Sequence, residues 1–311
     1  MARETLGTSN IGDMRRSSIC RPLVAVALLL ALPALSSGWG FDVHRFVTGR
    51  AIALLPPEIR PFFEKHAAFI AEHSVDPDLW RTAGFEIEPP RHFLDLDAYG
   101  AYPFDALPRD YAAAVAKFGE ETLAKNGTVP WRLQDVYDRL VKAFEQHKAG
   151  SSPYALENIK FFVAILAHYA ADAHVPLHAV VNYDGQLTGQ HGVHSRFESE
   201  LFARYARELR VDPPQLEPVS QPLEHVFDTL LESYQRVAPL LEADRQAIGD
   251  GTDYDDAYFA RFYAAMRPTL EERLSKSAAS AAALVAGAWN KAGRPTLPLE
   301  QQRMVRKRRP A

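Results

Sequence analysis

Apolar residues recur at three- and four-residue intervals along almost the whole chain, a spacing typical of amphipathic helices. No segment shows the convincing alternation of apolar and polar residues that predicts a half-buried strand. Prolines occupy the gaps between these segments or open the next one, where a missing N–H does least harm. We therefore expect an all-α fold, with helices over residues 42–55, 57–73, 108–125, 132–148, 153–174, 192–210, 221–246, 252–266 and 268–292.

Two long polar stretches separate the predicted helices. Functional sites often lie on long loops held by a rigid scaffold. The second stretch, residues 175–192, carries His178 and His191. The first, about residues 75–107, carries Asp76, Asp78, Arg81, His92, Asp95 and Asp97.

The first 38 residues predict a cleaved secretory signal peptide. Arginines precede the apolar run from Leu23 to Leu35, and small residues follow it. The run is shorter than the about 20 residues that span a bilayer, which favours a signal over an uncleaved anchor. The mature chain would begin at Trp39, carry no transmembrane segment and be secreted or periplasmic. Translation could start at Met1 or at Met14.

Cysteine and charge narrow the chemistry of the mature chain. The single cysteine, Cys20, lies inside the signal, so any zinc ligands must be His and carboxylate side chains. The formal net charge is −4, and removal of the signal makes it −6 because four basic and two acidic residues are lost. No overall basic field remains to attract nucleic acid. We expect one domain over residues 39–293, followed by a flexible basic tail over residues 294–311.

The densest chemical signal is the segment HYAADAHVPLH, from His168 to His178. His168 and Asp172 are four residues apart, so a helix places both on one face, where they can hold one ion. Pro176 cannot continue the helix, which lets His178 turn toward a neighbouring ion. His194 and Glu198 repeat the four-residue spacing. A structural hydrogen-bond network without metal is the alternative explanation.

Together these motifs resemble the zinc-dependent phospholipase C / S1–P1 nuclease superfamily, over about Trp39 to Trp289. The segment WGFDVH, Trp39 to His44, is similar to the family's mature N-terminus, where the tryptophan amino group and carbonyl bind zinc. The resemblance implies a single-domain, multi-helix fold around a trinuclear site of three Zn²⁺ ions. It also explains cleavage after residue 38, since an amino group binds metal only when free and deprotonated.

The resemblance also implies a ligand for each position that matches the family's motifs. One ion would bind Asp78, with Asp76 as the fallback, together with His92, His168 and Asp172. Asp172 would also bind a second ion, and ligands farther along the chain would hold the remaining ion. His174 would support the ligands from behind or pack in the core, and His191 has no counterpart in the family. The metal ligands are thus expected to be Trp39, His44, Asp78, His92, His168, Asp172, His178, His194 and Glu198.

These ions imply a hydrolytic mechanism. Closely spaced zinc ions lower the pKa of a water molecule, create a hydroxide nucleophile and neutralise phosphate charge. Asp78 is the residue expected to orient that water. Arg81 could contact the phosphate, although a surface salt bridge is an equal alternative.

The substrate is less constrained than the metal site. Glu198 and Asp42 match the phospholipase branch, but Leu79 and Pro89 stand where aromatic residues would hold choline. Phe93 could stack on a base and Asp95 could accept hydrogen bonds from it, although a Gly-Gly-Asn segment typical of the nucleases is absent from residues 179–192.

We therefore expect hydrolysis of a phospholipid head-group ester, as in phospholipase C. S1/P1-type cleavage of single-stranded nucleic acid is the alternative. A phosphomonoesterase and a non-catalytic zinc-binding protein also remain open. No obligate protein partner is evident.

Overall fold

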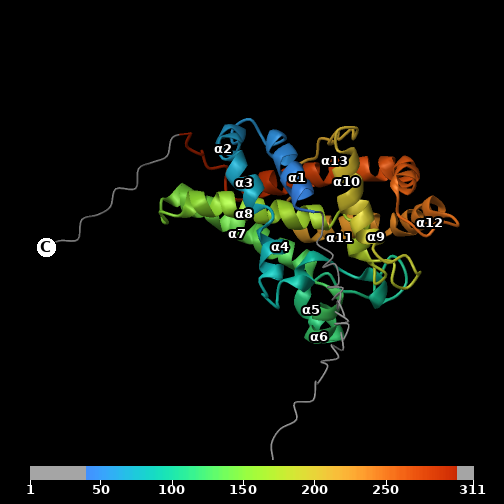
Figure 1. The fold of residues 1–311 in the computed structure, drawn as a ribbon. Helices are drawn as coiled ribbons and strands as arrows, with labels where there is room; N and C mark the ends of the chain where they lie inside the picture. The colour runs from blue at the N-terminus through green and yellow to red at the C-terminus, as the bar shows by residue number, and fades with distance from the viewer. Residues whose placement is uncertain (1–39, 300–311) are drawn as a thin grey trace, which may run out of the picture. The chain divides into compact units, whose positions relative to one another are not determined.

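The computed structural model of the chain describes residues 40–299, which form helices and connecting loops without strands (Figure 1). The predicted all-α class is confirmed for these residues. The predicted signal peptide, Trp39 and most of the basic tail lie outside them. Within residues 40–299, no helix is long and apolar enough to cross a membrane.

Helices α7 (Val129–Ala149) and α8 (Ala155–Asp172) form a hairpin in the middle of the described fold (Figure 1). Gly150 ends α7 with φ 61°, a left-handed conformation that glycine adopts without strain. Pro130 lies in the first turn of α7, where the N–H it lacks would have no partner in the helix. The hairpin carries His168 and Asp172 on its second helix.

The longest helix, α13 (Asp256–Lys291), packs against α7, α8 and α1 (Phe41–Ala53). The sequence predicts a break at Pro268, and this prediction is wrong, because α13 continues through it. An interior proline costs a helix about 3 kcal/mol. Met266 and Leu270 on either side of it are buried, and this burial offsets the cost.

Other predicted helices are divided where the chain changes direction within one or two residues. Periodicity does not register so short an interruption. The divided pairs are α2 (Arg60–Lys65) with α3 (Ala67–His73), α5 (Tyr111–Phe118) with α6 (Glu120–Asn126), and α11 (Pro222–Tyr234) with α12 (Val237–Ile248).

The two predicted loops contain short helices that the sequence analysis missed. The first holds α4 (Asp76–Thr82) and two 3₁₀ turns, Pro89–His92 and Leu96–Tyr99. The second holds a 3₁₀ turn over Pro176–Ala179. Beyond it, the chain forms α9 (Val193–Ser195), a π-helical turn over Arg196–Glu200 and α10 (Leu201–Tyr205).

The C-terminal end of α8 lies between two clusters of buried apolar side chains. Ala170 belongs to the larger cluster, with α7 and the second half of α13, whereas Ala171 belongs to the other, with α1 and the first half of α13. His168 and Asp172 therefore project into a region enclosed by apolar packing, and both are fully buried.

Candidate metal centre

Metal-ligand side chains from seven helices and helical turns meet around the end of α8. These side chains form three buried groups. Within each group, every residue offers one nitrogen or oxygen atom, and these atoms lie within 4.8 Å of one another. The groups are His44, His168 and Asp172; Asp78, His92 and His168; and His178, His194 and Glu198. The structure thus unites eight of the nine predicted ligands, and the ninth, Trp39, lies outside the described residues.

The first two groups share His168. His92 Nδ1 lies 2.9 Å from Asp172 Oδ2 and 3.1 Å from His168 Nε2. Asp78 Oδ1 lies 3.8 Å from His92 Nδ1. Four ligand atoms around one zinc ion stand about 3.3 Å apart when the bonds are about 2.0–2.1 Å long. The observed separations are therefore close to those of a tetrahedral zinc site.

Asp172 lies where the groups meet, and its two oxygens face different neighbours. Oδ2 faces His92 and His168, which lies 3.1 Å away through Nε2. Oδ1 faces His44 Nε2 at 3.6 Å and His178 Nδ1 at 3.8 Å. This geometry suits a carboxylate that bridges two cations.

The third group stands on the 3₁₀ turn after α8 and on the following short helices. His194 Nε2 lies 3.0 Å from Glu198 Oε2, and the rings of His178 and His194 have centroids 5.0 Å apart. Pro176 ends the regular helix, as the sequence predicts, and His178 turns toward both Asp172 and His194.

Several buried atoms of the centre have no hydrogen-bond partner among the described residues. Buried polar atoms are ordinarily paired, because burial without a partner is unfavourable. A cation bound by these groups would satisfy them, so the residues fit a metal. The atoms without a hydrogen bond are His44 Nδ1 and Nε2, both oxygens of Asp78, His92 Nε2, Asp172 Oδ1 and His178 Nδ1.

Hydrogen bonds from outside the centre fix the ligands on α8. His168 Nδ1 donates to the Ser74 carbonyl at 2.8 Å, which leaves Nε2 directed at the centre. Beyond the end of α8, the Ala173 carbonyl accepts from Ser233 Oγ at 2.7 Å and the His174 carbonyl from Arg273 Nε at 3.0 Å. These bonds pair backbone groups that the end of a helix would otherwise leave exposed.

The electrostatics keep several histidines neutral. Burial lowers the pKa of His178 to about 3 and that of His194 to about 4. Burial, with the nearby His168, also holds the pKa of His44 well below its ordinary value. Imidazole binds metal only when it is neutral, so these side chains are prepared to act as ligands.

The pKa values of the three carboxylates in the centre shift in opposite directions. Burial raises the pKa of Glu198, and the charges of Asp172 and Asp78 raise it further. Burial also raises the pKa of Asp78. For Asp172 burial acts in the same direction, but His168 and the hydrogen bonds from His168 and His92 outweigh it and hold the pKa low. A cation among these groups would favour the charged form of all three.

The structure also distinguishes the two candidate aspartates. Asp78 is fully buried within the centre, whereas Asp76 pairs with His73 at 2.7 Å outside the three groups. Arg81 Nη2 lies 3.2 Å from Asp78 Oδ1, with its side chain mostly buried. Burial is the main cause that lowers the pKa of His178, and the guanidinium charge of Arg81 lowers it further.

The other singled-out residues lie outside the three groups. His174 is buried and its Nδ1 donates to the Ala170 carbonyl at 2.7 Å, while the His191 side chain is exposed. Asp42 is 88% exposed and pairs with Arg45. Phe93 is half-buried with its ring against Gly127, and burial raises the pKa of nearby Asp95 to about 7.

Two features of the site went unnoticed in the sequence. Tyr183 is half-exposed with its ring centroid 6.4 Å from that of His194, so an aromatic face lies beside the third group. Arg196 is buried and pairs with Asp244, which is distant in sequence. Only the position of Arg196 between His194 and Glu198 could have drawn attention to it.

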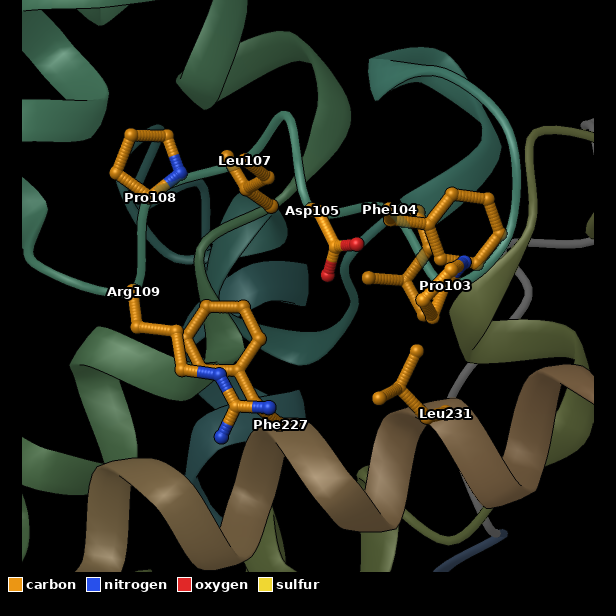
Figure 2. A pocket seen from close by; sticks show the side chains of 9 residues that line it. Pro103, Phe104, Asp105, Leu107, Pro108, Arg109, Phe227 and Leu231 are labelled. Atoms are coloured by element: carbon orange, nitrogen blue, oxygen red, sulfur yellow. The ribbon is translucent and has the colours of Figure 1, made fainter.

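A separate hollow of about 280 Å³ lies between the loop after the second 3₁₀ turn and α11 (Figure 2). Most of the residues that line it are apolar, and Arg109 lies over the ring of Phe227. Arg109 also pairs with Glu224 and Asp228. None of the three ligand groups lines this hollow. This hollow is therefore separate from the candidate metal centre.

No family model matches this chain, and no curated protein is significantly similar to it. The function is therefore inferred from the residues of the centre and from their arrangement.

Proposed function

We propose that the chain is an exported, zinc-dependent hydrolase of phosphodiester bonds that acts on phospholipid head groups, as phospholipase C does. The observation that carries this proposal is the position of Asp172, whose two oxygens face different histidine groups in a buried centre. A bridging carboxylate with histidines on both sides is suited to closely spaced divalent cations.

The donor set favours zinc over harder cations. Imidazole nitrogen with carboxylate oxygen suits zinc, whereas calcium and magnesium prefer oxygen alone. The described residues that would hold the ions are those of the three groups. We further propose that the amino group of Trp39, freed by cleavage of the signal, completes the set. In support, Gly40 lies so close to Ser199, next to Glu198, that an added Cβ would stand 2.9 Å from Ser199 Oγ.

The side chains of this protein divide the remaining work. Bound zinc would supply Lewis acidity, which acidifies water and neutralises charge on a phosphate. Asp78 would accept a proton from the attacking water or orient it, and Arg81 would donate hydrogen bonds to a phosphate oxygen. The apolar clusters around α8 exclude bulk water, which strengthens both interactions.

Three observations favour a lipid over a nucleic acid. The segment between Asp78 and His92 exposes large apolar side chains, with Phe85 57% and Ile87 65% exposed, as expected beside a lipid surface. Tyr183 supplies an aromatic face beside His194 that a quaternary ammonium could contact. The chain is also acidic overall, with a formal net charge of −4, which disfavours a polyanion.

The second candidate is a single-strand nuclease. Phe93 directly follows the ligand His92, and its half-exposed ring could stack on a base. Asp95, with a pKa of about 7, could exchange hydrogen bonds with that base as donor or acceptor. This arrangement supports nucleotide binding without requiring a basic surface.

The test uses protein expressed with its signal, so that Trp39 is freed. Zinc per chain is measured first, and the same sample is then assayed on phosphatidylcholine vesicles and on single-stranded DNA, with and without chelator. About three zinc ions and chelator-sensitive lipid cleavage are expected. Faster cleavage of DNA would favour the nuclease, and zinc without cleavage of either substrate would indicate a binding protein or a phosphomonoesterase. No zinc would overturn the proposal.

A further inference from the structure

A second buried charged cluster lies directly behind the third ligand group. Arg196 and Asp244 are 4% and 0% exposed. Asp244 Oδ1 accepts from Arg196 Nε at 3.1 Å and Nη2 at 2.9 Å, and also from the Tyr258 hydroxyl. Asp244 Oδ2 accepts from Gln190 Nε2 at 2.7 Å. This cluster joins the short helices after the second loop to α12 and α13.

Arg196 also holds the backbone of the loop that precedes the ligands. Its Nη1 donates to the His191 carbonyl at 2.7 Å and its Nη2 to the Gln190 carbonyl at 3.2 Å. The Arg196 guanidinium stacks on the Tyr254 ring, 3.8 Å from its centroid. The Arg196 guanidinium is therefore fixed by hydrogen bonds and by stacking.

The same loop fixes the ligand His194 from its other side. His194 hydrogen-bonds to the backbone of Tyr183 near the start of the loop, while its Nε2 faces Glu198. Asp184 Oδ2 accepts from the Gly192 N–H at 3.0 Å and closes the loop on itself. A shift of this loop would rotate the His194 ring away from Glu198.

The position of Arg196 explains how one residue can brace both ligands. It lies two residues after His194 and two before Glu198, and two helical residues correspond to a rotation of about 200°. Its side chain therefore projects away from the face that carries the ligands. The π-helical turn over Arg196–Glu200 begins at this residue, and such turns are rare and frequently lie at functional sites.

We propose that Arg196, held by Asp244, is a positioning residue that sets the geometry of His194 and Glu198 and thereby the affinity of the third ion. The inference rests on the proposed zinc-dependent function. Arg196 belongs to none of the three ligand groups, so it would act through the loop carbonyls and the π-helical turn. Residues of this kind change metal affinity about 10–100-fold when they are replaced.

The test compares zinc content and chelator competition in the full-length, signal-processed protein. Arg196→Lys keeps the positive charge but loses the paired contacts, and should bind one zinc about 10–100-fold more weakly while the remaining ions keep their affinity. Arg204→Met is the matched control. It breaks an exposed ion pair, Arg204 with Asp256, that also reaches α13 from these short helices, and should leave all affinities unchanged.

Replacement of Arg196 alone by Met would leave Asp244 buried without its cation, so a folding defect must be separated from a positioning defect. The double variant Arg196→Met/Asp244→Leu removes both charges and is expected to fold, as judged by circular dichroism and thermal unfolding. It should still lose one zinc, because the loop carbonyls are no longer held.

Full zinc affinity in Arg196→Lys, or in a folded double variant, would overturn the inference. A wild-type protein without zinc would overturn it together with the proposed function. A wild-type protein with three zinc ions but no hydrolysis would overturn only the catalytic proposal, and the zinc count in the variants would then still decide the inference.

Discussion

The protein buries ionisable side chains in two neighbouring clusters that differ in how they are paired. Around Asp244, each carboxylate oxygen accepts hydrogen bonds, and Arg196 donates to both the carboxylate and loop carbonyls. Around Asp172, histidines and carboxylates approach one another, yet several of their atoms have no partner among residues 40–299. Both oxygens of the Asp244 carboxylate are paired, whereas Asp172 Oδ1 and both oxygens of Asp78 accept no hydrogen bond from the described residues.

This difference separates a structural network from a ligand site. Buried polar groups that are fully paired stabilise one arrangement of the chain, whereas unpaired ones destabilise it. An Asp172 cluster without a cation would be unfavourable, since Asp78 and Glu198 both have raised pKa values from burial. A bound cation removes that penalty.

The largest expected effect is the loss of the bridge. Asp172→Asn should lower hydrolytic activity about a thousandfold, because it removes a charge shared between two ion sites, each worth several kcal/mol. His44→Gln and His178→Gln, which change one site each, are the matched controls and should lose less. Steady-state rates together with zinc content measure this. Equal losses in all three variants would contradict a bridging role.

Removal of zinc with a chelator should have the next largest effect, a loss of stability that originates at the candidate metal centre. Removal of zinc is expected to reduce the free energy of unfolding by about 3 kcal/mol, as for a ligand at a few hundred times its Kd. The thermal midpoint would then fall by about 5 °C for a chain of this size. Calorimetry with and without chelator measures the change, and restored zinc should reverse it. An unchanged midpoint would indicate that the centre is stable without metal.

A smaller loss of stability is expected from a change in the Asp244 cluster. Tyr258→Phe removes a hydroxyl that donates to Asp244, and should lower the free energy of unfolding by about 1–2 kcal/mol. The contacts from Arg196 to Asp244 remain, so zinc content should stay unchanged. Denaturant unfolding and metal analysis of the same sample test both statements. Loss of zinc here would show that the two clusters are less separable than their pairing indicates.

A pH-dependent effect concerns Asp95, which lies outside both clusters. Its pKa is raised by burial from 3.8 to about 7. The folded state therefore binds a proton that the unfolded state releases, so its contribution to stability is present below pH 4 and is lost as pH rises through about 7. Asp95→Asn lacks this dependence.

Stability measured from pH 4 to 8 should therefore fall in the wild type relative to Asp95→Asn, by up to about 4 kcal/mol at about 1.4 kcal/mol per pKa unit. Parallel curves for the two proteins would show that Asp95 is ionised throughout.

Local pattern sufficed for the helical class and for several pairs of ligands. The four-residue spacing of His168 and Asp172, and of His194 and Glu198, places each pair on one face whatever the rest of the fold does. Pro176 breaks the helix because its ring blocks the next hydrogen bond, and this too is a local effect. Eight of the nine ligands that the resemblance implied lie in three buried groups in the structure.

Tertiary packing decided what local pattern left open. Pro268 lies within α13 because burial on both sides outweighs the lost hydrogen bond. Asp78 joins the centre while Asp76 faces His73, a choice made by the direction of α4.

The pairing of Arg196 with Asp244 joins residues 48 positions apart, and no periodicity encodes a contact at that separation. Helical spacing, which is a local property, thus indicated two pairs of possible metal ligands, and the resemblance implied the others. Only the folded structure decided which of them lack other partners, because that depends on every segment that packs around α8.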